Sequence, residues 1–257
     1  MTQESGEYIG RARRILADED GRVLDELDAL RAFERRLDRI DPTLSASRGP
    51  AGPTAVHVST ASPSCHADIE RIRQHYRETV MAVPHYDEDY GDSLDESLAE
   101  EFGAEIATAL RTQPGVSPML KSRLVDAVRT SIEQREAFCD ALDAERESLA
   151  TAERAVTELS TAIDSHRDPP LAARQPGELF SLWETTCDLR ERCDAAAAER
   201  QRTLPTQTVA VADEQVPRVV YYYRSLPVDY PALHDVARVG QRIDDLRASV
   251  EHYLTRF

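Results

Sequence analysis

Six carboxylates lie close together in the segment PHYDEDYGDSLDE, and their spacing is the nearest the chain comes to a cation site. Oxygen-rich loops of this kind bind calcium and magnesium. The spacing departs from a helix–loop–helix calcium site, because glycine stands fifth rather than sixth from Asp87 and the twelfth position is Leu98. We therefore expect a solvated acidic loop, and no metal site, at Asp87, Glu88, Asp89, Asp92, Asp95 and Glu96.

A second candidate cluster, for zinc, combines one cysteine with three histidines. Zinc prefers ligands that converge, usually as two close pairs. Cys65 and His66 point to different sides of the expected helix, and His75 and His85 follow more than two turns later. We expect no zinc site. The four cysteines contain no CxxC pair and are expected to be reduced thiols: Cys65, Cys139, Cys187 and Cys193.

The motifs of common enzymes do not occur in this sequence. It contains no GxSxG, HExxH, GxxxxGK[ST] or GxGxxG segment. A hydrolase would also need a nucleophile with a base and an orienting acid. Because most of the chain follows heptad patterns instead, we predict no enzyme, no catalytic residue and no cofactor.

Three consecutive tyrosines, Tyr221, Tyr222 and Tyr223, stand between Arg218 and Arg224. Tyrosine and arginine are enriched at the centres of protein interfaces, and aromatic rings flanked by arginine stack on nucleic-acid bases. The alternative is that these rings pack on a helical core while their hydroxyls stay in water. We favour packing.

The charge composition indicates adaptation to high salt. The 257 residues include 31 Lys and Arg, of which only Lys121 is lysine, against 47 Asp and Glu. Arginine packs and pairs with carboxylates better than the strongly hydrated lysine does. No apolar run of some 18 residues occurs, and the N-terminal segment lacks the apolar stretch of a signal peptide. We expect a halophilic, cytoplasmic protein without a membrane partner.

Apolar periodicity predicts an all-α fold, an elongated helical bundle. The predicted helices cover residues 4–40, 65–83, 94–111, 119–165, 178–202 and 231–257. Ser64, Ser93 with Glu96, and Ser117 before Pro118 are expected to cap three of them. The longest helix should bury a stripe at alternating intervals of four and three residues: Phe138, Leu142, Glu145, Leu149, Ala152, Val156, Leu159 and Ile163.

We divide the chain into an N-terminal helix (1–40), a flexible Pro/Gly/Ser linker (41–64) and a main helical bundle (65–257). Within the bundle, residues 119–202 are predicted to form a long antiparallel coiled-coil hairpin. One or two short strands, or an extended strap, should precede the last helix, at Val209–Val211 and Val219–Tyr223. The N-terminal helix could dock on the same bundle or pair with a second chain, and we favour docking.

The segment RIRQHYRETVMAVPHYDEDYGDSLDESLAEEFGAEIATAL resembles a haloarchaeal family described as a domain of unknown function. The similarity continues through LKSRLVDAVRTSIEQREAFCDALDAERESL and extends over residues 1–257. The resemblance implies a salt-adapted helical protein. It carries over no activity, cofactor or catalytic residue.

These observations favour a non-catalytic interaction or scaffold protein that uses coiled-coil faces to bind itself or another protein. The alternative is a regulator that contacts DNA through Arg11, Arg13 and Arg14 or through the tyrosine segment, although no helix-turn-helix pattern is present. An enzyme of unrecognised type is the third hypothesis. No small-molecule substrate is predicted.

Overall fold

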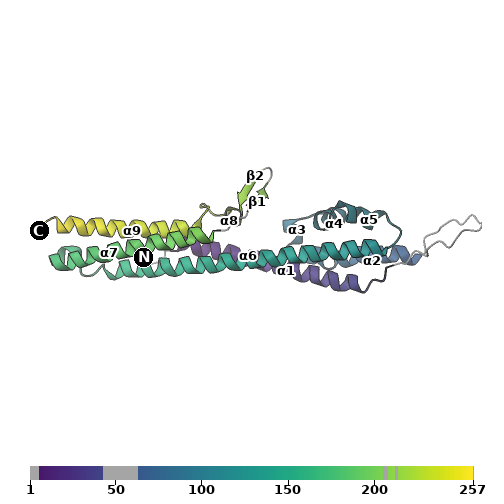
Figure 1. Cartoon of the computed structure of the whole chain (residues 1–257), viewed down its shortest axis with the longest axis horizontal. Helices are drawn as coiled ribbons and strands as arrows, with labels where there is room; N and C mark the ends of the chain where they lie inside the picture. The colour runs from purple at the N-terminus through teal and green to yellow at the C-terminus, as the bar shows by residue number, and fades with distance from the viewer. Residues whose placement is uncertain (1–5, 43–62, 205–207, 212–213, 257) are drawn as a thin grey trace, which may run out of the picture. The chain divides into compact units, whose positions relative to one another are not determined.

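The computed structural model describes residues 6–42, 63–204, 208–211 and 214–256. These residues are helical apart from one pair of short strands, so the predicted all-α class is confirmed (Figure 1). The elements are α1 Glu7–Asp38, α2 Pro63–Arg77, η1 Val80–Ala82, α3 Tyr86–Asp89, α4 Leu94–Phe102, α5 Ala104–Thr112, α6 Pro118–Ser165, η2 Leu171–Ala173, α7 Pro176–Thr203, β1 Thr208–Val211, β2 Glu214–Pro217, α8 Arg218–Tyr222 and α9 Pro231–Leu254.

The chain forms two compact units. The central unit contains residues 20–140, and the terminal unit contains residues up to 19 together with those from 141 onward. The division falls inside α1 and α6, so each of these helices contributes to both units. Residues 43–62 of the predicted linker lie outside the described residues, and Pro63 and Ser64 belong to α2.

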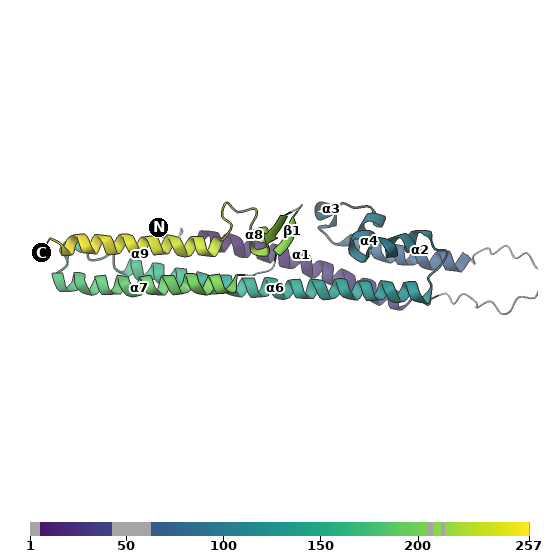
Figure 2. The ribbon, with the colours of Figure 1, turned by 45° about the horizontal axis from the view of Figure 1, so that its top comes forward.

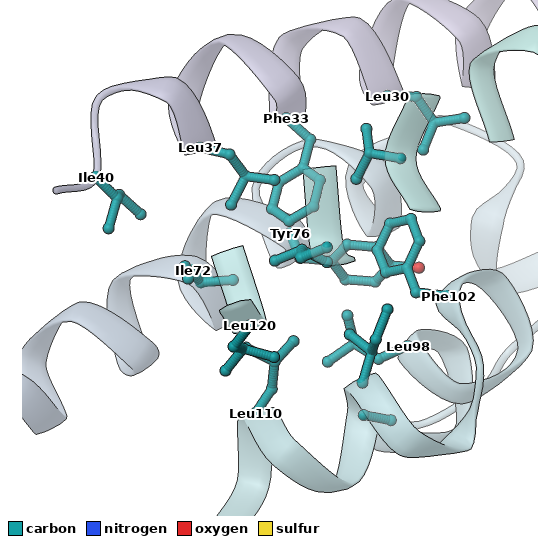
Figure 3. Packing of buried hydrophobic residues seen from close by; sticks show 14 of the residues in the cluster. Leu30, Phe33, Leu37, Ile40, Ile72, Tyr76, Leu98, Phe102, Leu110 and Leu120 are labelled. Carbon is teal, nitrogen blue, oxygen red and sulfur yellow. The ribbon is translucent and has the colours of Figure 1, made fainter. Parts of the chain in front are cut away.

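Three aromatic rings form the middle of the central unit's core (Figure 3). Phe33 of α1, Tyr76 of α2 and Phe102 of α4 have ring centroids 5.4 to 5.9 Å apart. The hydroxyl of Tyr76 lies 2.8 Å from Oγ of Ser97 and is thereby satisfied inside the core. Burying each aromatic side chain contributes about 1.5–3 kcal/mol. The core thus fixes α1, α2 and α4 with respect to one another within this unit.

The predicted helix 94–111 is two helices, which corrects the sequence prediction. Gly103 has φ +91° and separates α4 from α5, a backbone conformation that residues with a Cβ rarely adopt. Two further bounds differ. α2 ends at Arg77, before the predicted residue 83, and the predicted acidic loop contains the single helical turn of α3.

The predicted caps at Ser93 and Ser117 are confirmed, whereas the cap predicted at Ser64 is wrong, because α2 already begins at Pro63. Ser93 and Glu96 form a reciprocal capping box at the start of α4. Oγ of Ser117 accepts a hydrogen bond of 3.1 Å from the backbone N–H of Leu120 at the start of α6. Each such cap stabilises a helix by about 1 kcal/mol.

In the terminal unit, α6 buries the stripe that the heptad pattern predicts. Leu142, Leu149, Val156 and the other predicted positions from 142 to 163 are all buried there, including Glu145. Phe138, the first predicted position, is only half-buried and belongs to the central unit. The stripe therefore describes α6 within the terminal unit.

α7 and α9 lie side by side in the terminal unit, as Figures 1 and 2 both show. Gly240 of α9 permits the close approach. A Cβ at this position would lie 2.5 Å from Nη1 of Arg190 and 3.3 Å from Sγ of Cys193, both on α7. α9 also contacts the start of α1. The backbone N–H of Ile9, in the first turn of α1, donates to Oδ2 of Asp235 on α9 at 2.9 Å, so the Asp235 side chain caps α1.

β1 and β2 pair antiparallel, with Val209 opposite Val216. The extended structure predicted for Val219–Tyr223 is wrong, because residues 218–222 form α8. Pro217 stands at the helix N-cap, and Val219 and Tyr222, three residues apart, are both buried. Burial on one helical face outweighs the β-propensity of this short run.

Candidate functional site

The acidic segment is divided among α3, the following turn and α4, and arginines from other helices pair with much of it. Arg22 of α1 pairs with Glu88 and Asp89. Nη1 of Arg73 on α2 lies 2.6 Å from Oδ1 of Asp95. Among the described residues, no group of three or more His, Cys, Asp or Glu side chains is arranged to hold a metal ion. The sequence could not reveal these partners, because they come from distant helices.

The histidines of the zinc hypothesis do not come together. Nε2 of His85 lies 3.3 Å from Oε1 of Glu26, whereas His75 lies on α2, where burial lowers its pKa. The side chains of Cys65 and His66 lie outside the described part. Cys139, Cys187 and Cys193 form no disulfide bond, and burial raises the pKa of Cys193.

The tyrosine segment packs largely inward. Tyr222 and Tyr223 are buried, and burial raises the pKa of Tyr222 to about 12. Tyr221 remains partly exposed beneath Arg224, whose guanidinium lies 4.2 Å from its ring centroid. These three rings therefore do not form one exposed stacking surface.

The arginines of the DNA hypothesis also have partners in the chain. Arg13 pairs with Glu153 of α6. The guanidinium of Arg11 lies 5.7 Å from the centroid of Tyr8, and Nε of Arg14 donates to the backbone oxygen of Gly10 at 3.3 Å.

The central unit contains a cluster of polar side chains that we call the open centre. It consists of Glu26, His85, Tyr90, Glu101 and Arg135. Arg135 donates to both oxygens of Glu101, at 2.9 and 2.7 Å, and its Nε lies 3.3 Å from Oε2 of Glu26. The hydroxyl of Tyr90 donates to Oε1 of Glu26 at 2.8 Å. Burial lowers the pKa of Arg135, but Glu101 and Glu26 raise it by more. The arginine therefore stays charged and joins α1, α4 and α6.

A second centre, here the sealed centre, lies in the terminal unit. Nη1 and Nη2 of Arg200 donate to the two oxygens of Glu145 at 2.9 and 2.6 Å, and the Tyr223 hydroxyl donates to Oε1 of Glu145 at 2.6 Å. The side chains of Arg200 and Glu145 are 2% and 0% exposed. Burial raises the pKa of Tyr223, so its hydroxyl keeps the proton that it donates. This centre joins α6, α7 and the residue after α8.

Sequence reasoning placed Glu145 in the buried stripe of α6 and missed its partner. On α7 the buried positions are Leu179, Leu182, Thr186, Leu189 and Cys193. The same alternation of three and four continues through Ala196 to Arg200. α6 and α7 thus each have one charged residue in the buried stripe, Glu145 on α6 and Arg200 on α7. Two opposite charges in facing apolar stripes predict that they form a buried ion pair.

Next to the sealed centre, a groove of about 610 Å³ runs between α6 and α7. Its walls are small side chains and hydroxyls, with carboxylates at the edge and Arg200 at the base. The α6–α7 groove is lined by Ala144, Glu147, Ser148, Thr151, Ala152, Ala155, Ala196, Glu199, Arg200 and Thr203. A groove of this volume is large enough for several apolar side chains or a small ligand.

None of the helices in the described part has the length and apolar character that crossing a membrane requires.

Comparison with known proteins identifies one family. The family model described as "Domain of unknown function (DUF7260)" matches residues 7–247. No curated protein and no solved structure matches the chain.

Proposed function

We propose that this protein, which belongs to the DUF7260 family, is a non-catalytic interaction or scaffold protein that binds a partner helix in the α6–α7 groove. The observation that carries this proposal is the groove itself, a hollow lined by small residues beside a buried stripe. Large apolar side chains of a helix pack into holes between small side chains on neighbouring helices. In this proposal, α6 and α7 act as the long antiparallel coiled-coil hairpin, with the strand segment as a strap beside it.

The length of the groove favours a short helical partner. Its α6 wall runs from Ala144 to Ala155, which corresponds to about 16 Å or three turns of helix. A stable interface between two protein copies buries about 1,600 Å², far more than a groove of three turns provides. A single amphipathic helix of a partner protein fits better than a second copy.

The charge at the groove edge favours a partner with basic residues. Glu147 is exposed and has no ion-pair partner among the described residues, whereas Glu199 pairs with Arg202. Arg200, at the base, is neutralised by Glu145. We therefore propose an amphipathic helix with bulky apolar residues on one face and an arginine placed to meet Glu147.

We also propose that binding takes place in a salt-rich, haloarchaeal cytoplasm, since all but one of the 31 Lys and Arg are arginine. At 1 M salt the Debye length is only about 3 Å, so long-range attraction contributes little. Apolar packing in the groove would then supply most of the affinity, and Glu147 would set the register.

Site-specific photo-cross-linking tests the proposal. A photo-reactive residue at Thr151 should cross-link one protein in the host at native salt, and one at Thr157, exposed on the same helix outside the groove, should not. A synthetic helix from that partner should bind the purified chain, measured by fluorescence anisotropy. Thr151→Trp, which fills the groove, should weaken binding at least tenfold, and Thr157→Trp should not.

Two results would overturn the groove assignment. One is equal binding of the partner helix by the Thr151→Trp and Thr157→Trp variants. The other is cross-linking at Thr151 to nucleic acid, which would support the DNA hypothesis, or solely to a second copy of the chain.

A further inference from the structure

Two stacked aromatic rings lie at the surface of α7, away from the α6–α7 groove. Phe180 is 53% exposed, more than any other aromatic side chain of the described residues. Its ring centroid lies 6.0 Å from that of Trp183, at an interplanar angle of 25°. Trp183 is only partly buried and is the one tryptophan of the chain. The groove is lined by residues of α7 from Ala196 onward, so the two rings belong to a different part of the helix.

The apolar surface around these rings continues onto α9. The start of α7 and the end of α9 lie side by side (Figures 1 and 2), with a small core of Leu179, Leu182 and Val250. Trp183 packs against this core and stays partly exposed. Four other partly exposed side chains do the same: Leu171, Leu246, Tyr253 and Leu254. We call Phe180, Trp183 and these four side chains the aromatic patch.

The exposure of this patch points to an interaction surface. Aromatic residues make up only 6% of the chain, and others, such as Phe33 and Tyr76, are fully buried in the core. Contiguous apolar side chains at a surface mark sites where another molecule binds. Tryptophan is also enriched among the few residues that supply most of the affinity of protein interfaces.

Two carboxylates beside the rings lack a cationic partner. Glu184 follows Trp183 directly and lies one helical turn after Phe180; it is exposed and forms no ion pair with a described residue. Oε1 of Glu251 on α9 accepts a hydrogen bond of 2.9 Å from Nε1 of Trp183. Glu251 likewise forms no ion pair within the described part of the chain. The rings therefore have unneutralised negative charge next to them.

The arginines near the end of α9 have other contacts. Arg247 pairs with Asp244 at 3.1 Å, one turn earlier on the same helix. The guanidinium of Arg256 lies 5.6 Å from the ring centroid of Tyr253. An arginine thus already lies against one ring of the patch, whereas Phe180 and Trp183 have no such cation among the described residues.

We propose that the aromatic patch binds a segment of a partner protein that presents an arginine between apolar residues. The guanidinium stacks on the exposed rings of Phe180 and Trp183 and pairs with Glu184. Its apolar neighbours cover Leu246 and Leu254. Arginine suits this surface better than lysine, because the guanidinium is planar and more weakly hydrated and stacks on aromatic faces. This inference does not depend on the α6–α7 groove.

The charges beside the patch disfavour a second copy of the chain as the occupant. A two-fold interface places the same surface of both copies together. Glu184 and Glu251 of one copy would then face the same carboxylates of the other, and like charges in contact are unfavourable. A partner that supplies a positive charge removes this cost.

Titration of the full chain with the capped peptide acetyl-Leu-Arg-Leu-amide in molar KCl tests the proposal. Because Trp183 is the only tryptophan, its emission reports directly on the patch. The arginine peptide should change the emission and then saturate. The same peptide with citrulline, which keeps the shape and lacks the charge, should need at least a tenfold higher concentration for half-saturation. The lysine peptide should need a severalfold higher one.

Variants at exposed positions localise the binding, and far-UV circular dichroism verifies that each one folds. Phe180→Ala should raise the half-saturating concentration at least fivefold, and Glu184→Gln should raise it severalfold. Glu191→Gln removes an exposed, unpaired carboxylate two turns further along α7 and should leave it unchanged. Tyr230→Ala, at a ring 37% exposed before α9, should also leave it unchanged.

A photo-reactive residue at position 180 extends the test to the natural partner, with position 230 as the control. In the host at native salt, it should cross-link a protein close to one of that protein's arginines, and replacing this arginine by glutamine should abolish the cross-link. Cross-linking solely to a second copy of the chain would overturn the proposal. Absence of saturable binding of the arginine peptide, or equal binding of the citrulline peptide, would overturn it as well.

Discussion

The open and sealed centres use the same chemistry, an arginine that holds a carboxylate with two hydrogen bonds, and differ in their access to water. Arg200 and Glu145 are 2% and 0% exposed, and a tyrosine hydroxyl completes their set. Arg135 and Glu101 are 22% and 14% exposed, and their surroundings contain more carboxylates than arginines. Removing one partner of the sealed pair leaves a buried charge without a counter-ion, whereas water and salt can reach the groups of the open centre.

The largest expected effect comes from breaking the sealed pair. Glu145→Gln leaves the Arg200 charge buried without its counter-ion and should cost about 3–5 kcal/mol of unfolding free energy. Trp183 is the only tryptophan and lies on α7 in the terminal unit, so its fluorescence follows urea unfolding of that unit. Glu147→Gln, two residues away and exposed, is the matched control and should cost less than about 0.5 kcal/mol.

Replacing all three polar residues of the sealed centre tests whether the pair is needed for the stability of the terminal unit. Glu145→Leu with Arg200→Met and Tyr223→Phe removes both charges and the hydroxyl, and should recover most of the lost free energy. If Glu145→Gln alone left the urea midpoint unchanged, the sealed centre would not be buried as described.

The second effect, intermediate in size, tests the open centre. Arg135→Gln leaves Glu26 and Glu101 without their counter-ion but partly exposed to water. It should lower the free energy of unfolding by about 1–2 kcal/mol, less than Glu145→Gln does. Hydrogen exchange in α4 and α5 measures it. Added KCl should recover stability in this variant, because cations can reach the two carboxylates, and should not do so in Glu145→Gln. Equal costs and equal salt responses would remove the distinction between the centres.

The third prediction concerns two helix glycines, one in each unit, that differ in how closely a neighbouring helix approaches them. Gly240→Val places a branched side chain where a Cβ already meets Cys193 and Arg190, and should cost about 1–3 kcal/mol in the Trp183 unfolding curve. Gly21→Ala lies in α1 of the central unit with nothing within 4 Å of the new Cβ, and should stabilise its helix by about 0.5–1 kcal/mol. A stabilising Gly240→Val would mean that α7 and α9 are not in close contact.

Most of the helices could be predicted from the sequence because their signals are local. The apolar stripe of α6, the caps at Ser93 and Ser117, and α9 beginning at Pro231 depend on residues within a few turns. The break at Gly103 was missed, since a glycine inside an apolar pattern is compatible with either a continuous or an interrupted helix. The β-propensity of Val219–Tyr223 predicts a strand, whereas the burial of Val219 and Tyr222 that stabilises α8 depends on packing against other parts of the chain.

The candidate sites were less predictable because they depend on distant partners. The acidic run from Glu78 to Leu110 contains no Lys or Arg, and its partners Arg22, Arg73 and Arg135 come from other helices. The groove between α6 and α7 depends on small residues from both helices. Glu145 was the informative exception, because a charged residue in an apolar stripe requires a buried partner.

The smallest expected effect is the pH dependence contributed by Asp235, whose carboxylate caps α1. Burial raises its pKa, and the hydrogen bond from Ile9 lowers it by less. The folded state therefore binds the proton more tightly than the unfolded state does. The stability that protonation confers is fully present below the ordinary pKa of about 3.8 and is lost as pH rises through the raised value. Asp235→Asn cannot ionise and keeps an oxygen acceptor, so the stability of the native chain relative to this variant should fall over that pH range. Urea midpoints from Trp183 fluorescence measure the difference, with exposed Asp229→Asn as the control. A difference that stayed flat, or rose with pH, would show that Asp235 is not buried against the start of α1, and the terminal unit would then lack this contact between its first and last helices.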